Sequence, residues 1–422
     1  MNILTDPVTG DRCMTVTHKS GLTVCIAEQP DFHTASALLG VRFGSVHRQF
    51  TADGRSVSLP AGTAHFLEHK LYDSADGDAV TKFTRLGASD NAYTAFDRTV
   101  YYFSAQQRFA EALALLLDFV QRPYFTAESL EKERPIIAQE IHEYSLDSPE
   151  DRIFFLLLEG LFHRHPVRCD VAGTLRSIQD ITPELLYQCH RAFYHPSNLV
   201  LCCAGNLTAE EVLEIADRTV QILPPVQTVT EPVREPETVF RQEVRERMTV
   251  SKPQFAVGFK SPPVTGEALL RQTLLGELVL DYIAGPSSPC CQRMLSEGLI
   301  NDTFSVSAFT GESWFVLMAE GESDAPEAVR DALTAEIARV RREGIDGERF
   351  AALKRAAYGD AILSANSPAA AAEAMTDAML RRLSSPYAVT ALLPALTAAE
   401  AEALTAERLR PDRVCLAVID PC

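Results

Sequence analysis

A metal-binding pattern occurs at residues 65–69, which read His-Phe-Leu-Glu-His. Positions i, i+3 and i+4 are neighbours on a helix surface, so His65 and His69 can reach one metal ion while Glu68 faces a water molecule beside it. This arrangement is typical of a zinc hydrolase, in which the carboxylate acts as a general base. The alternative is an ordinary helix with two surface histidines. The surrounding sequence favours the zinc site.

A third ligand must come from elsewhere, because a catalytic zinc ion has three protein ligands and one open position. Residues 130–144 read LEKERPIIAQEIHEY and are predicted to form a helix with one apolar stripe. Glu140 borders that stripe, where an ionised carboxylate is costly unless it is paired or binds a metal. Glu133, two turns earlier on the same side, could orient the site. A solvated carboxylate is the alternative for Glu140. The predicted stripe consists of Ile136, Ile137, Ile141 and Tyr144.

The chain resembles the pitrilysin–insulinase family of zinc metallopeptidases, which includes the mitochondrial processing peptidase, in three runs: GTAHFLEHKLYD (62–73), LGASDNAYTAFDRTVYYF (86–103) and KERPIIAQE (132–140). The spacing between the motif and Glu140 is slightly shorter than in the family, so Glu143 remains an alternative ligand. The resemblance implies one Zn²⁺ per chain, with these residues: ligands His65, His69 and Glu140, general base Glu68, and supporting carboxylate Glu133.

The second half of the chain lacks this chemistry, because no histidine follows His195. Active family members often supply an arginine and a tyrosine from a segment resembling residues 285–304. This chain has Glu297 at the place of the arginine, and Asn301 and Asp302 at the place of the tyrosine. Nearby Arg293 is interpreted as a solvent-facing helix residue. The arginine–tyrosine pair is therefore predicted to be missing.

A partner chain is implied by that absence. Residues 165–174 and 193–199 resemble the short bacterial members that work as pairs, the YmfH-type chains. In such two-chain peptidases one subunit carries the zinc motif and the other carries the arginine and the tyrosine. The resemblance thus implies a homologous partner subunit that carries the pair, or otherwise a homodimer.

The length of 422 residues predicts two to three domains, and an internal repeat divides the chain. Residues 101–105 recur as 315–319, and 195–206 recur as 410–421. A proline- and threonine-rich stretch between the repeats reads as a linker. We expect a catalytic half at 1–224, a linker at 225–240 and a homologous non-catalytic half at 241–422. The resemblance implies an α+β fold: two homologous domains, each a mostly antiparallel sheet with helices on one face, enclosing a cavity.

Composition limits the possible binding partners and the cellular compartment of the protein. The formal net charge of −18 disfavours nucleic acid and could favour basic peptides, or only solubility. The N-terminal region has no signal-peptide pattern, and no apolar run is long enough to span a membrane. The ten cysteines form no disulfide or metal framework, so we expect reduced thiols. A cytoplasmic protein without membrane contact is predicted.

A peptide is the expected substrate. The strand-like stretch 91–97 precedes an alternating segment at 99–103, and in the family the corresponding strand offers its edge to an extended peptide. Asn91 and Ala92 are therefore candidate substrate-binding residues, with a simple turn role as the alternative for Asn91. Two other functions stay open: a non-catalytic assembly subunit, which usually loses the motif, and a zinc amidohydrolase acting on a non-peptide substrate.

Overall fold

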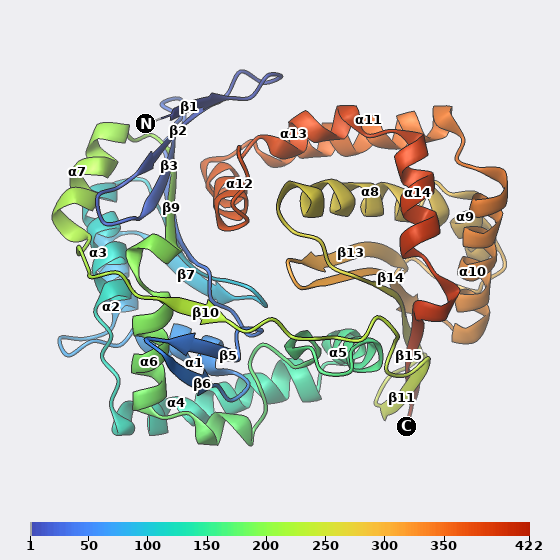
Figure 1. The fold of residues 1–422 in the computed structure, drawn as a ribbon, viewed down its shortest axis with the longest axis horizontal. Coiled ribbons are helices and arrows are strands. Elements are labelled where there is room, and N and C mark those ends of the chain that lie inside the picture. Colours follow the sequence, from blue (N-terminus) through green and yellow to red (C-terminus); the bar gives the residue numbers. More distant parts are fainter. Residues whose placement is uncertain (1) are drawn as a thin grey trace. The chain divides into compact units, whose positions relative to one another are not determined.

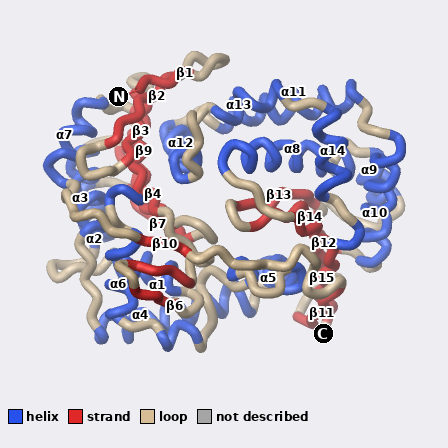
Figure 2. The backbone as a smooth tube through the Cα atoms, viewed as in Figure 1, coloured by secondary structure: helices blue, strands red, loops and turns tan. Residues whose placement is uncertain are grey.

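The computed structural model describes residues 2–422 and divides the chain into two compact units. The first unit contains the residues up to Ile141, together with Asp170–Glu231 and Ala361–Thr390. The second unit contains His142–Cys169, Pro232–Asp360 and Ala391–Cys422. Figure 1 labels the elements, and Figure 2 shows that each unit mixes helices with strands. This is the predicted α+β class.

The units differ from the predicted halves, 1–224 and 241–422, in two segments. Helix α5 (Pro149–Leu161) precedes the predicted linker but packs on the sheet of the second unit. Helix α12 (Pro368–Leu380) follows the linker but packs on the sheet of the first unit. A repeat in the sequence identifies two similar halves. It does not determine on which of the two sheets the apolar face of a given helix packs. The contiguous boundaries therefore need this correction.

A seven-stranded sheet forms the centre of the first unit, in the order β1-β2-β3-β9-β4-β8-β7. Its neighbouring strands are antiparallel except for the parallel pair β3 and β9. A second small sheet has the order β10-β5-β6. The strands are β1 (Asn2–Thr5), β2 (Arg12–Thr17), β3 (Thr23–Glu28), β4 (Ala35–Val41), β5 (Gln49–Ala52), β6 (Arg55–Ser58), β7 (Ser89–Thr94), β8 (Thr99–Ala105), β9 (Leu199–Gly205) and β10 (Thr228–Thr230).

Helices cover both faces of this sheet, and not one face as expected. The helices of the first half share a core with alternate residues of β4, such as Leu39 and Val41. Helix α12 packs on β4 and β9 from the opposite side, and both strands are buried along their whole length. The other helices are α1 (Thr63–Leu71), α2 (Ala79–Leu86), α3 (Phe109–Gln121), α4 (Ala127–Glu140), α6 (Pro183–Phe193), α7 (Ala209–Thr219) and α13 (Ala388–Leu392).

The second unit repeats this design. Its sheet has the order β11-β15-β12-β14-β13, and the pair β11 and β15 is parallel, as β3 and β9 are. The remaining pairs are antiparallel. The elements are β11 (Glu243–Met248), β12 (Gln254–Ser261), β13 (Ser305–Gly311), β14 (Trp314–Glu322), β15 (Val414–Pro421), α8 (Gly266–Ala284), α9 (Pro289–Ser296), α10 (Pro326–Glu343), α11 (Gly347–Ser364) and α14 (Ala398–Arg408).

A glycine lies where each of the two helices that pack outside their own half of the sequence, α5 and α12, meets its sheet. A Cβ atom on Gly40 of β4 would lie 3.0 Å from Leu380, and one on Gly258 of β12 would lie 2.9 Å from Leu157. Larger side chains at these positions would push the helix away. The absence of a side chain on the central strand therefore lets α12 and α5 pack closely on their sheets.

We predict that Gly258→Val destabilises the protein by about 1–3 kcal/mol, because overpacking a full core forces side chains or backbone to shift. The measurement is the shift of the urea or thermal unfolding transition. Gly359→Ala is the matched control, since its new Cβ meets no atom within 4 Å and lies in helix α11. That control should unfold no earlier than the wild type, because alanine favours helix. Equal stability of Gly258→Val and wild type would show that the contact with α5 is not tight.

Candidate metal centre

Helix α1 carries the predicted motif and is fixed by its first turn. Gly62 precedes the helix with φ 86°, a left-handed conformation that favours glycine. A Cβ there would lie 2.4 Å from the carbonyl oxygen of Ala172. Phe66 and Leu67 are fully buried and hold one face of the helix in the core. His65 and His69 consequently lie on the side that faces helix α4.

Helix α4 supplies the carboxylates. It begins with a capping box between Thr126 and Ser129, and Ile137 is buried in the core. The predicted stripe is wrong at two positions, since Ile136 is 51% and Tyr144 is 63% exposed. Ile136 is one position, and so about 100°, away from Ile137 around the helix. Tyr144 lies in a π-helical turn (Ile141–Leu146), which changes the spacing after α4.

Three donor atoms converge between α1 and α4. His65 Nε2 lies 3.3 Å from His69 Nε2, and Glu140 Oε2 lies 3.6 Å from the first nitrogen and 3.5 Å from the second. Tetrahedral zinc with bonds of about 2.0–2.1 Å places neighbouring ligand atoms about 3.3–3.4 Å apart. Within residues 2–422, these side chains are the one group of His, Cys, Asp or Glu that could share a metal ion. The alternative, Glu143, is exposed and is not in that group.

The histidines differ in protonation and support. Burial, together with the charge of His69, lowers the pKa of His65 to about 3, so its imidazole is neutral, as a metal ligand must be. Burial also lowers the pKa of His69, but the hydrogen bond to Glu133 and the charge of Glu140 raise it above its ordinary value overall. Within the described part of the chain, His65 Nδ1 is buried without a hydrogen-bond partner. The chain therefore orients His69 more firmly than His65.

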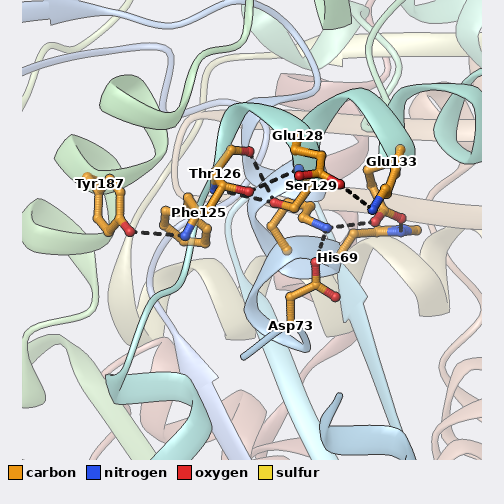
Figure 3. A network of polar contacts seen from close by, with 10 residues as sticks. His69, Asp73, Phe125, Thr126, Glu128, Ser129, Glu133 and Tyr187 are labelled. Atoms are coloured by element: carbon orange, nitrogen blue, oxygen red, sulfur yellow. Dashed lines mark hydrogen bonds and ion pairs between the residues drawn. The ribbon is translucent and has the colours of Figure 1, made fainter. Parts of the chain in front are cut away.

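Glu133, which the sequence spacing predicts as a supporting residue, forms a hydrogen bond with His69. His69 Nδ1 donates to Glu133 Oε1 at 3.1 Å, which leaves Nε2 free for a metal. Lys70 Nζ donates to Glu133 Oε2 at 3.0 Å and also contacts Asp73. Burial opposes ionisation of Glu133, but the hydrogen bonds from His69 and Lys70 lower its pKa to about 2. Figure 3 shows His69, Asp73 and Glu133 close together where α1 meets α4.

Lys70 was missed by sequence reasoning. Its side chain is 2% exposed, so its charge is stabilised by the carboxylates of Glu133 and Asp73 and not by solvent. The one feature of the sequence that could have indicated Lys70 is its position directly after His69. A lysine on a helix usually points into water, so this position alone did not indicate burial.

Glu68 lies beside the three candidate ligands and is only 7% exposed. Burial raises its pKa above the ordinary value, although a hydrogen bond from Thr94 acts in the opposite direction. Thr94 Oγ1 donates to Glu68 Oε2 at 2.6 Å. A carboxylate with a raised pKa next to a metal centre is suited to proton transfer. Thr94 was not singled out from the sequence, where it is one of several threonines in a strand-like run.

Strand β7 carries the predicted substrate-binding residues at the edge of the first sheet, with β8 on its one paired side. Asn91 is exposed, and its side-chain oxygen accepts from the backbone N–H of Ala92 at 2.8 Å. Ala92 is partly buried against the core. Asn91 is thus part of the strand, not of a turn, and among the described residues no strand pairs with the other edge of β7.

The segment predicted to lack the arginine–tyrosine pair lies in the second unit. Arg293 is exposed on α9, as interpreted, and Glu297 follows the end of that helix. Asn301 Nδ2 donates to Glu322 at 2.8 Å. Asp302 is exposed.

No helix in the described part of the chain is long and apolar enough to cross a membrane.

Two family models match the chain: "Insulinase (Peptidase family M16)" over residues 23–175, and "Peptidase M16 inactive domain" over residues 180–357. The uncharacterized zinc protease YmfH of Bacillus subtilis is 35% identical over 410 residues, covering 95% of each chain. A protein named "Probable mitochondrial-processing peptidase subunit beta" of Schizosaccharomyces pombe is 31% identical over 48% of this chain and 44% of its own length.

Solved structures agree with these matches. An M16-like peptidase from Alicyclobacillus acidocaldarius superimposes with a TM-score of 0.95 and 33% identity, over 99% of this chain and 100% of the other. Pitrilysin shares the fold with a TM-score of 0.78 and 16% identity, over 99% of this chain and 46% of its own. The chain therefore belongs to the M16, or insulinase, family of peptidases.

Proposed function

We propose that this chain is a zinc-dependent metalloendopeptidase that cleaves peptides or unfolded segments, and that it is the metal-bearing subunit of a two-chain enzyme. The observation that carries the proposal is the convergence of His65, His69 and Glu140 at 3.3–3.6 Å with the buried carboxylate of Glu68 beside them. Membership of a peptidase family and likeness to proteins named zinc proteases support it.

The mechanism assigns each side chain a task. His65, His69 and Glu140 would hold Zn²⁺, which supplies a Lewis acid for the scissile carbonyl and for water. Glu68 takes the proton of the attacking water and delivers it to the leaving amine. Glu133 keeps His69 in the tautomer with Nδ1 protonated.

Binding of the substrate backbone is assigned to the edge of β7. An extended peptide can pair with an open strand through main-chain hydrogen bonds, which fix its direction but select little among side chains. Asn91 and Ala92 lie on this edge strand. Loose sequence specificity is expected, as for an enzyme that acts on short or unfolded peptides.

A mixing experiment tests the two-chain proposal. The purified chain should hold zinc yet hydrolyse a peptide library weakly, because Glu297, Asn301 and Asp302 offer no cation or phenol to the substrate. Adding a homologous subunit with the arginine and the tyrosine should raise kcat/KM by at least about tenfold, the effect of about 1.4 kcal/mol on a transition state. Chelation of the metal should abolish the activity.

Sizing chromatography of the mixture shows whether the two chains associate. A homologous subunit whose arginine and tyrosine are replaced is the control, since it should associate without activating. Full activity of the single chain would contradict the division of labour. Absence of peptide hydrolysis in every mixture would contradict the peptidase proposal itself.

A further inference from the structure

The hydroxyl of Thr94 links the candidate general base to the candidate substrate strand. Thr94 is the last residue of β7, and its Oγ1 lies 2.6 Å from Glu68 Oε2, on helix α1. This distance lies in the short range of hydrogen bonds from a hydroxyl to a carboxylate oxygen. It joins two elements that the chain brings together from different parts of the sequence.

The neighbouring hydroxyl of Thr99 has an acceptor of its own. Thr99 on β8 is the cross-strand partner of Thr94 and is fully buried. Thr99 Oγ1 donates to the carbonyl oxygen of Phe43 at 2.8 Å and lies 3.4 Å from Thr94 Oγ1. The contact of Thr94 with Glu68 is much shorter, and in it Thr94 Oγ1 donates to Glu68 Oε2 at 2.6 Å.

Strand β7 is also held from its other face. Successive side chains of a strand point to opposite faces. Tyr93, next to Thr94, donates to Glu373 of helix α12 at 2.6 Å. Side-chain bonds on both faces thus fix the position of β7, while in the described part of the chain its outer edge pairs with no other strand.

We propose that Thr94 is a positioning residue that holds the Glu68 carboxylate in register with a peptide bound on the edge of β7. Glu68 Oε2 accepts from the Thr94 hydroxyl, and this bond orients the carboxylate. A peptide that pairs with β7 is then placed relative to Glu68 through one residue of the same strand. The kinetic consequence of this inference rests on the proposed peptidase function. Its structural consequence rests on the hydrogen bond alone.

The structural consequence is tested on the metal-free chain. Thr94→Val removes the hydroxyl at nearly constant volume and leaves a buried carboxylate oxygen without its donor. We expect Tm to fall by about 3–6 °C, whereas Thr94→Ser should restore most of the loss. In a Glu68→Ala background, Thr94→Val should change Tm by less than about 1 °C, because the coupled partner is gone.

The kinetic consequence is tested on the zinc-loaded chain with its partner. Thr94→Val should lower kcat at least about tenfold with KM changed less than about twofold, since misplacing a reacting group costs rate more than binding. Zinc content should stay unchanged. Thr84→Val is the matched control, because the Thr84 hydroxyl donates to the carbonyl oxygen of Val80 on the exposed side of helix α2. It should behave as the wild type in both assays.

Two results would overturn the inference. One is a Tm of Thr94→Val that equals the Tm of the wild type. The same holds if Thr94→Val lowers Tm by as much in the Glu68→Ala background as in the wild-type background. The other is a kcat that Thr94→Ser fails to rescue. If the wild-type protein hydrolyses no peptide, the proposed function fails, but the thermal cycle still decides whether Thr94 holds Glu68.

Discussion

Replacing Glu68 by glutamine should leave zinc bound and reduce peptide hydrolysis by about 10²–10⁴-fold, the usual contribution of a general acid–base group. Glutamine has the shape of glutamate and can still accept the hydrogen bond from Thr94, so the fold around the site should be preserved. It cannot take a proton from water. Because both imidazoles and Glu140 remain, metal binding and chemistry are separated in one variant.

The measurements are elemental analysis for zinc and kcat/KM on a peptide that the wild type cleaves. Glu128→Gln is the matched control, since it removes an exposed carboxylate at the start of α4 that pairs with Lys132. That control should retain wild-type kinetics. A Glu68→Gln protein that cleaves peptides at nearly the wild-type rate would mean that another group is the base.

The proximity of the two candidate ligands on α1 could be predicted because it is local. Residues four apart on a helix must lie on one face, so the motif sequence determines that His65 and His69 are neighbours. Glu140 was a candidate from its position beside the predicted stripe, and the family resemblance implied its role as the third ligand, since nothing in the sequence states how α4 packs against α1. Glu140 Oε2 lies 3.5–3.6 Å from both imidazole nitrogens, and its role as a ligand stays a prediction.

The contacts between distant segments could not be predicted. Thr94 and Lys70 are common residue types, and their importance depends on which carboxylate each one meets in the folded chain. The sequence did contain an indication, which the prediction did not use, that a helix from the other half packs on a sheet, as α5 and α12 do. Strand β4 reads as a continuous apolar run and is buried on both faces, and such a strand needs a helix on each side.

The error in the apolar stripe has a physical cause. The prediction assumed one regular α-helix over residues 130–144, but the structure changes to a π-helical turn after Glu140. A π-turn adds one residue to the repeat and so moves the following side chains around the axis. Glu140 is the last residue before that change, which places it at the junction next to the histidines.

Removing any one of the three ligands should empty the metal site. His65→Ala and Glu140→Gln each leave two donors, and we expect zinc affinity to fall by more than the roughly 10–100-fold that loss of an outer hydrogen-bonding group causes. Glu133→Gln, which alters only the support of His69, should fall within that smaller range. Zinc content after dialysis, and competition with a chelator of known affinity, give the order of the variants.

Glu143→Gln discriminates between the two candidate third ligands. Glu143 is exposed on the π-helical turn, whereas Glu140 Oε2 faces both imidazoles, so the Glu143 variant should keep its zinc. The expected order of zinc affinity is wild type equal to Glu143→Gln, then Glu133→Gln, then Glu140→Gln with His65→Ala. Retained zinc in Glu140→Gln together with its loss in Glu143→Gln would transfer the ligand role to Glu143. Because a third ligand also fixes the geometry that leaves one position open for water, peptide hydrolysis should follow the same order.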